Sequence, residues 1–143
     1  MFVTRWKLFL LMLAVLLGTV GCQRRDGPEL VTVKGVVTLD GRPLPKAVIR
    51  FEPINREGGA HSVGVTDKSG RFQLKYTRST YGALPGDHLV RITTGDPGAV
   101  DEFGNPTEIP ELLPAIYHKN STLTQTVSGS SNQFQYDLKS TAR

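Results

Sequence analysis

Residues 33–51 read Val-Lys-Gly-Val-Val-Thr-Leu-Asp-Gly-Arg-Pro-Leu-Pro-Lys-Ala-Val-Ile-Arg-Phe, which is two apolar runs joined by a tight turn. Apolar and polar residues alternate from Val31 to Leu39, and this period of two predicts a strand with one buried face. Gly35 interrupts the apolar face, as at a bulge or a close approach of another backbone. Asp40-Gly41 is typical of a turn, and a second strand is predicted from Ala47 to Pro53.

The same alternation continues along the chain. It predicts five further strands, at Ser62–Thr66, Arg71–Tyr76, Asp87–Thr94, Ser121–Val127 and Gln133–Leu138. Seven short strands with turns about every 10 residues predict an all-β fold, a single seven-stranded antiparallel β-sandwich. Asp40 and Asp67 are expected to form turns by accepting hydrogen bonds from backbone amides two residues on. The aromatic residues expected in the core are Phe51, Phe72, Phe134 and Tyr136, and those expected in exposed loops are Tyr81 and Phe103.

Three motifs resemble the carboxypeptidase regulatory-like domain family. They are the stretch 33–51 with its Asp-Gly-x-Pro-Leu turn, the Thr-Asp-x-x-Gly-x-Phe turn at 66–72, and the Pro-Gly entry to a strand at 85–90. His88 departs from the pattern, because the family usually has an aromatic residue there. The resemblance implies a prealbumin-like or transthyretin-like sandwich with Ig-like architecture over residues 31–143. This fold hosts many unrelated roles, so the motifs leave the function open.

The amino-terminal residues form a different kind of segment. Arg5 and Lys7 precede an apolar run from Leu8 to Val20. This run is shorter than the ~20 residues that span a bilayer, and it is typical of a signal peptide. The only cysteine of the chain, Cys22, follows directly after Gly21.

This arrangement resembles the lipobox of small bacterial lipoproteins. The resemblance implies cleavage between Gly21 and Cys22, a diacylglyceryl group on the Cys22 sulfur, and acylation (a palmitate-type chain) of the new amino terminus. Thr19 departs from the pattern, because the family prefers Leu three residues before the cysteine. The alternative is an ordinary secretory signal followed by an unrelated cysteine.

The implied organisation has three parts: a lipoprotein signal peptide, helical in its apolar core, at residues 1–21, a lipidated tether at 22–30, and the sandwich domain at 31–143. The implied location is the bacterial cell envelope, with the domain facing the periplasm or the exterior. Gln23 is not the aspartate that marks inner-membrane retention in some bacteria. We therefore expect the outer rather than the inner membrane.

Composition excludes some function classes. The chain has 17 Lys and Arg against 13 Asp and Glu, a formal net charge of +4. This balance does not favour nucleic-acid binding, which depends on a clustered basic surface. A single cysteine excludes an internal disulfide. No cofactor is expected beyond the covalent lipid on Cys22.

Residues for catalysis or metal binding do not form a recognisable pattern. The three histidines, His61, His88 and His118, lack metal-ligand spacing on one element. An intradiol-type metal oxygenase would need two histidines and two tyrosines, and a transthyretin-related hydrolase ends in Tyr-Arg-Gly-Ser, whereas this chain ends at Arg143 without that tetrapeptide. We therefore expect no catalytic or metal-binding residues.

Residues 95–113 form a long segment without a strand pattern and without Lys or Arg. Its acidic residues are Asp96, Asp101, Glu102, Glu108 and Glu111. Long irregular segments in small domains are often functional. Three interpretations stay open here: a Ca²⁺ site, a contact with a basic protein partner, and a solvated loop.

The expected role is a non-catalytic binding, adhesion or envelope-structural module attached to a membrane. Candidate partners are the membrane itself through the lipid, an envelope protein and a glycan. The alternatives are a carbohydrate-binding module, which an exposed row of aromatic residues would favour, and a transthyretin-related hydrolase or metal-dependent oxygenase, which histidines converging in a pocket would favour. The sequence leaves the ligand and the oligomeric state open.

Overall fold

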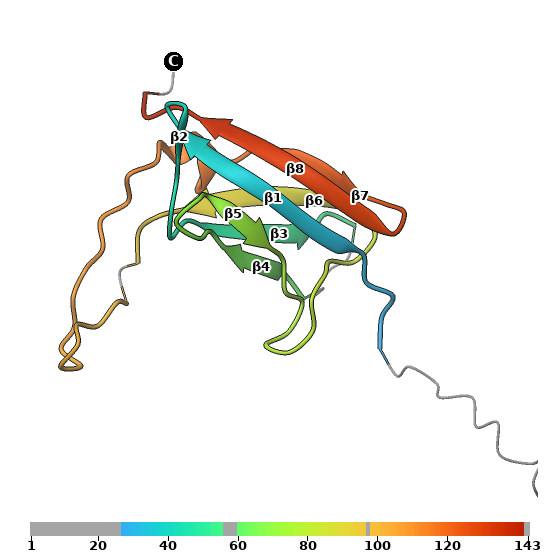
Figure 1. Ribbon diagram of the computed structural model, residues 1–143, viewed down its shortest axis with the longest axis horizontal. Helices are drawn as coiled ribbons and strands as arrows, with labels where there is room; N and C mark the ends of the chain where they lie inside the picture. The colour runs from blue at the N-terminus through green and yellow to red at the C-terminus, as the bar shows by residue number, and fades with distance from the viewer. Residues whose placement is uncertain (1–26, 56–59, 97, 142–143) are drawn as a thin grey trace, which may run out of the picture.

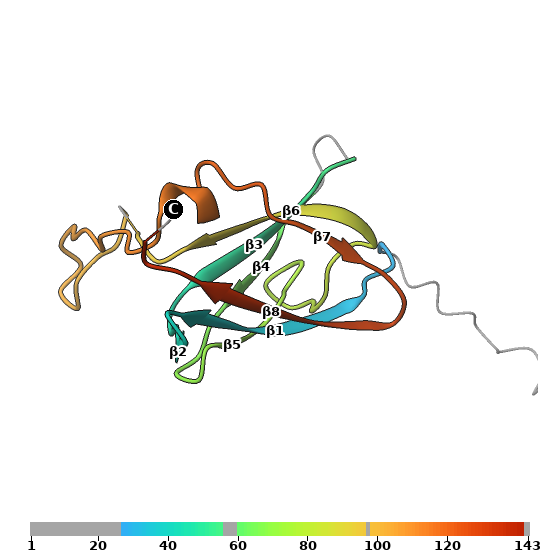
Figure 2. The same ribbon diagram turned by 90° about the horizontal axis from the view of Figure 1, so that it is seen from above.

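Two β-sheets packed face to face form the body of the protein, and the predicted all-β sandwich is confirmed. The computed structural model describes residues 27–55, 60–96 and 98–141. The strands are β1 (Thr32–Leu39), β2 (Arg42–Pro43), β3 (Val48–Pro53), β4 (Ser62–Val65), β5 (Arg71–Gln73), β6 (Gly86–Thr93), β7 (Thr124–Val127) and β8 (Ser131–Leu138), with one short 3₁₀ helix, η1 (Ala115–Tyr117). Figures 1 and 2 show the two layers and the crossing from β7 into β8.

The first sheet is built around β1. Strands β5 and β2 pair with one edge of β1 in antiparallel register, and β8 pairs with the other edge along its whole length, from Thr32↔Ser131 to Leu39↔Leu138. This last pairing is parallel, which corrects the expectation of a purely antiparallel sandwich. The chain reaches β8 from β7, which belongs to the second sheet. It therefore changes sheets between β7 and β8 and can run beside β1 in the same direction.

The second sheet has the order β4-β3-β6-β7, and all of its pairings are antiparallel. Ile49 of β3 lies opposite Ile92 of β6, and Phe51 lies opposite Val90. All four of these side chains are completely buried, because alternate residues of both strands face the first sheet. They make up the centre of the core, together with Val33 and Val37 of β1 and neighbouring residues.

The predicted core aromatics pack between the sheets. Phe51 stacks on Phe134 with ring centroids 6.0 Å apart, and Phe72 stacks on Tyr136 at 6.3 Å. Phe51, Phe72 and Tyr136 are buried and Phe134 is half-buried. The Phe51–Phe134 stack joins the two sheets, the Phe72–Tyr136 stack lies within the inner face of the first sheet, and all four rings face the core as the alternation predicted.

Gly35 lies at a close approach between neighbouring strands, one of the two alternatives expected for it. A Cβ atom at this position would collide with the Phe134 carbonyl oxygen and would lie 2.6 Å from Cε1 of Phe72. Only glycine therefore leaves room beside β1 for both the Phe134 carbonyl of β8 and the Phe72 ring of β5.

The two turn aspartates behave differently. Asp67 Oδ1 accepts hydrogen bonds from the amides of Ser69 and Arg71, at 2.8 and 3.0 Å, so its predicted role is confirmed. Gly70 completes that turn with a φ of 73°. Asp40 also lies in its predicted turn, between β1 and β2, with a φ of 50°, but its side chain has a different partner from the one expected. Its Oδ1 atom accepts from the amide of Ser140 at 3.2 Å, and this long-range bond holds the chain after β8 against the β1–β2 turn.

The predicted strand Arg71–Tyr76 is regular only as far as Gln73. Beyond it, Lys75 forms isolated bridges to Val63 and Tyr81, so the chain leaves the first sheet and crosses to the edge of β4. The Val63 and Lys75 backbones exchange two hydrogen bonds of 2.9 Å. These bonds connect the two sheets along the β4–β5 side of the sandwich.

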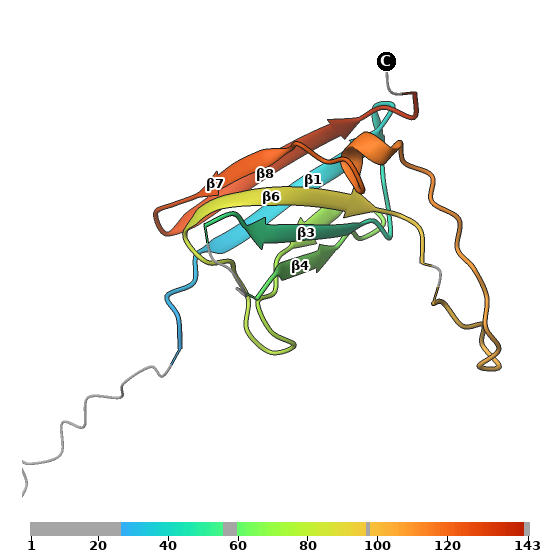
Figure 3. The ribbon, with the colours of Figure 1, turned by 180° about the vertical axis from the view of Figure 1, so that it is seen from behind.

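The two outer faces of the sandwich differ. The connection that carries η1 lies against the outer side of β6 in the second sheet (Figure 3). No described segment lies over the outer face of β8, β1 and β5, which is seen in front in Figure 1. Residues 27–31 enter β1 at one end of the sandwich, and the segment after β6 projects from the other end (Figure 1).

Candidate functional site

The acidic segment at residues 95–113 extends away from the sandwich as a narrow arm (Figures 1 and 3). Isolated antiparallel bridges Asp96↔Ile109 and Val100↔Pro106 hold its two sides together. The segment predicted to be irregular therefore has a ladder-like backbone with a turn at its tip. We call it the arm.

Asp101 organises the tip of the arm. Its Oδ1 atom accepts hydrogen bonds from the amides of Phe103 (2.9 Å) and Asn105 (2.8 Å), and Oδ2 accepts from the Asn105 side chain at 3.0 Å. These bonds, led by the one from the Asn105 side chain, lower the pKa of Asp101. Asp96 forms a similar short turn by accepting from the Gly98 amide at 3.0 Å. Both aspartates stabilise the arm itself.

Glu111 fixes the root of the arm to the end of β6. Its carboxylate accepts from the amides of Thr94, Gly95 and Leu113, at 3.0, 3.2 and 2.9 Å, and from the Thr94 hydroxyl at 2.5 Å. Partial burial raises the pKa of Glu111, but the hydrogen bonds from Thr94, Leu113 and Gly95 outweigh it, so the pKa is lowered overall. An ionised Glu111 therefore holds both ends of the arm together.

Only Glu102 and Glu108, of the five predicted acidic residues, have exposed carboxylates that accept no hydrogen bond from any described residue. Three of the five thus serve the arm's own backbone. Within residues 27–55, 60–96 and 98–141, no three His, Cys, Asp or Glu side chains are grouped so that they could hold a metal ion. The structure spreads the acids along the arm instead of gathering them around one point.

Large apolar side chains of the arm are exposed. The exposed fraction is 80% for Phe103 at the tip, 62% for Val100 and 63% for Leu112, and the expectation that Phe103 is exposed is confirmed. A hollow of about 480 Å³ lies at the root of the arm and is lined by Arg91, Thr93, Glu108, Ile109, His118 and Lys119, among others. The arm itself is apolar and acidic, whereas the hollow at its root also has the basic side chains of Arg91 and Lys119 in its wall.

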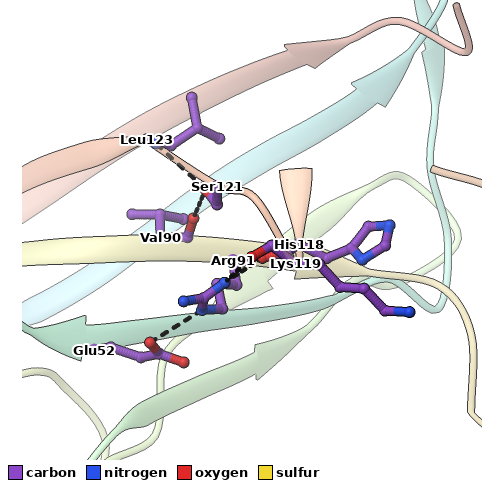
Figure 4. Close-up of polar contacts among 7 residues, drawn as sticks. All are labelled: Glu52, Val90, Arg91, His118, Lys119, Ser121 and Leu123. Atoms are coloured by element: carbon purple, nitrogen blue, oxygen red, sulfur yellow. Dashed lines mark hydrogen bonds and ion pairs between the residues drawn. The ribbon is translucent and has the colours of Figure 1, made fainter. Parts of the chain in front are cut away.

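Arg91 of β6 holds the connection that follows the arm (Figure 4). Its Nε atom donates to Glu52 of β3 at 3.1 Å, and its Nη1 atom donates to the backbone carbonyls of His118 and of Lys119, the latter at 3.2 Å. This role of Arg91 was not predicted from the sequence, because its partners are mainly backbone atoms. The alternation that directs Arg91 outward is the only sequence signal for it.

Ser121 continues the same attachment toward β7. Its hydroxyl donates to the Val90 carbonyl at 2.5 Å and accepts from the Leu123 amide at 3.3 Å (Figure 4). Regular pairing of β7 with β6 starts at Thr124, so the predicted strand from Ser121 begins later than expected. The serine occupies the position where the chain rejoins the sheet.

The three histidines lie in different environments. His88 is 1% exposed, its ring lies 5.6 Å from that of Phe51, and Nδ1 lies 3.0 Å from the Gly86 carbonyl, while Nε2 has no partner among the described residues. Burial lowers the pKa of His88, against smaller effects from Gly86 and Asp87. His118 Nε2 lies 3.0 Å from the Leu113 carbonyl, and His61 is exposed. His88 is thus a core residue, on the same buried face of β6 as Val90.

The remaining site predictions lie outside the described residues. These are Cys22 as the lipid attachment point, the cleavage position between Gly21 and Cys22, and the signal segment at 1–21. Among the residues that the structure describes, none belongs to a helix long and apolar enough to cross a membrane.

Comparison with known proteins identifies no family for the chain. No family model matches it, and no curated protein matches it. Among solved structures, it is similar to BcpA, the major pilin subunit of Bacillus cereus, at 14% identity and a TM-score of 0.47 over 80% of this chain and 31% of that chain. It is also similar to a DUF3823 family protein from Parabacteroides merdae, at 13% identity and a TM-score of 0.40 over 79% of this chain and 46% of the other. The chain thus spans less than half of either structure, and these matches carry no information on function.

Proposed function

We propose that this chain is an exported lipoprotein whose sandwich is a non-catalytic binding module of the cell envelope. Its first 22 residues support the anchor, because a basic start, a short apolar run and a single cysteine occur in the order of a lipoprotein signal. On this proposal the acylated Cys22 inserts into the outer membrane and the tether at residues 22–30 connects it to β1. Stable attachment requires more than one acyl chain, which the lipoprotein pattern provides.

The arm is the observation that carries the proposed binding role. Exposed apolar side chains gathered on one projecting segment are typical of contact sites between proteins. The carboxylates of Asp101 and Glu111 stabilise this segment by accepting hydrogen bonds from its own backbone amides, so its shape does not depend on a partner. Binding to a preformed segment costs less conformational entropy than binding to a flexible one.

The chemistry of the arm defines the partner. Glu102 and Glu108 have no hydrogen-bond partner among the described residues and can pair with cations, and residues 95–113 contain no Lys or Arg. A complementary protein surface would have an apolar pocket for Phe103, ringed by Lys or Arg side chains. We therefore propose an envelope protein with such a basic-rimmed pocket as the partner.

The position of the arm fits an anchored module. Residues 27–31 leave the sandwich at the end opposite to the arm (Figure 1). An anchor attached through the tether would therefore leave the tip of the arm accessible. Substitution Cys22→Ser in cells should move the chain from the membrane fraction to the soluble fraction, whereas continued membrane retention of this variant contradicts the anchor.

A photo-crosslinking experiment in cells tests the binding role of the arm. Phe103→p-benzoylphenylalanine should yield one discrete adduct, and Tyr81→p-benzoylphenylalanine is the matched control, since Tyr81 is an exposed loop aromatic outside the arm. The adduct should disappear when Glu102→Lys and Glu108→Lys are added. The purified adduct protein should then bind the unmodified chain more weakly at high salt. Equal adducts from positions 81 and 103 contradict the proposal.

A further inference from the structure

The outer face of the first sheet carries an ordered grid of polar side chains. The register places Gln73, Lys34 and Gln133 in one row across β5, β1 and β8, and Arg71, Val36 and Gln135 in the next row. These residues face away from the core, because the alternate residues Val33, Val37, Phe72 and Tyr136 are buried. The backbone pairing of three strands thus fixes where each side chain of the grid starts.

The two cations of the grid have no ion-pair partner among the described residues. The one ion pair within the described part of the chain joins Arg91 and Glu52, so neither Lys34 nor Arg71 has an acidic partner there. Lys34 and Arg71 are diagonal neighbours on paired strands, with a separation on the order of 7–8 Å. The guanidinium group can hold a carboxylate through two parallel hydrogen bonds, and the ammonium group can add a second charge contact.

The amides of the grid add donors and acceptors. The Gln133 side chain forms no hydrogen bond with any described residue, and Gln135 Nε2 donates to Asp137 Oδ2 at 3.0 Å, which leaves the Gln135 carbonyl oxygen available. Asp137 Oδ1 is occupied by the Thr38 hydroxyl at 2.7 Å. Side-chain amides match hydroxyl groups well, because each partner can both donate and accept.

These side chains surround a hollow of about 560 Å³, lined by Lys34, Val36, Arg71, Gln133 and Gln135 among others. This volume is within the range of small-molecule binding sites. No described segment of the chain covers it, whereas the outer side of β6 is occupied by the connection that Arg91 holds (Figures 1 and 4). The half-buried Val36 gives the centre of the hollow an apolar floor.

We propose that this face is a second binding site, and that it takes an acidic saccharide. Arg71 and Lys34 would bind the carboxylate, the glutamine amides would bind hydroxyl groups, and Val36 would contact the C–H side of a sugar ring. Recognition here depends on charge and amides and uses no exposed aromatic platform. The proposal is independent of the arm and of the lipid anchor, which lie on other parts of the chain.

Isothermal titration of the full-length chain in detergent with tetragalacturonate tests the site. We expect binding by the unmodified chain, weakened about tenfold or more in the double variant Lys34→Ala/Arg71→Ala. The matched control is Arg42→Ala/Lys68→Ala, which removes the same charge at exposed positions outside the hollow. This control should change the dissociation constant less than about twofold, and thermal unfolding of each variant should show that the fold is retained.

Two further ligands separate the parts of the proposal. Maltotetraose, a neutral saccharide of the same length, should bind far more weakly, since it lacks the carboxylates. Tetraglutamate, which carries charge without hydroxyl groups, should also bind more weakly. Failure of tetragalacturonate to bind, equal binding by the Lys34→Ala/Arg71→Ala variant, or equal binding of tetraglutamate would each overturn the acidic-saccharide site.

Discussion

Arg91 and His118 are joined by a hydrogen bond from a side chain to the backbone. The Nη1 atom of Arg91, on the outer face of β6, donates to the His118 carbonyl just after η1, while Nε pairs with Glu52 at 3.1 Å. One guanidinium group therefore connects β3, β6 and the chain that returns from the arm.

Arg91→Met should lower the free energy of unfolding by about 1–3 kcal/mol, because it leaves Glu52 and two carbonyl groups without a donor. Arg50→Met is the matched control, since Arg50 lies opposite Arg91 on β3 and is exposed. That change should have almost no effect or should stabilise slightly, because it removes a like charge. Urea unfolding measures both, and an equal loss in the two variants would contradict the role of Arg91.

Gly35→Ala should destabilise the sandwich by about 2 kcal/mol, since the added methyl group collides with the Phe134 carbonyl and the Phe72 ring. Gly27→Ala serves as the comparison, because nothing lies within 4 Å of a Cβ there. Urea unfolding should separate the two clearly. A Gly35→Ala protein as stable as the Gly27→Ala protein would show that β1 and β8 do not approach as described.

His88 should make the protein less stable in mild acid. Burial lowers its pKa in the folded state from 6.5, so the unfolded chain binds the proton first as the pH falls. The free energy of unfolding should therefore decrease as the pH drops below 6.5, until the folded-state pKa is passed. His88→Gln should remove this part of the pH dependence. His61→Gln, at an exposed position, should retain the pH dependence. A loss of the pH dependence in His61→Gln rather than in His88→Gln would contradict the role of His88.

Glu111→Ala should loosen the root of the arm. Hydrogen exchange of the Thr94, Gly95 and Leu113 amides should become faster, because their acceptor is removed. Glu108→Ala, the control on the same arm, should leave these amides unchanged. Since the pKa of Glu111 is lowered, the root should stay closed above its ordinary value of 4.5 and open only as the pH falls below it. Protection that is the same in both variants would contradict this.

Alternation was sufficient to predict most strands, because the apolar residues of each one face a single core. It predicted neither the parallel pairing of β1 with β8 nor the two-residue strand β2. Partners far apart in the chain are selected by the packing of whole sheets, and a period of two contains no information on which strands meet. The early end of β5 has a similar cause, since Lys75 pairs across to Val63.

The candidate site was predictable only in part. A lack of Lys and Arg identified the segment 95–113 as unusual, and Phe103 as an exposed aromatic followed from its loop position. That Asp101 and Glu111 serve the backbone of the arm could not be deduced, because amide partners leave no trace in residue identity. The role of Arg91 could not be predicted for the same reason, since its partners are mainly backbone atoms. That Lys34 and Arg71 are neighbours follows only from the strand register.

Intact-mass analysis of the chain extracted from native membranes tests the central proposal most directly. We predict that residues 1–21 are absent and that the mass of the remainder exceeds that of residues 22–143 by a diacylglyceryl group and one further acyl chain, with fragment ions placing the glyceryl group on Cys22. A chain that retains residues 1–21, or one cleaved there with an unmodified Cys22 thiol, would contradict the lipid-anchored module.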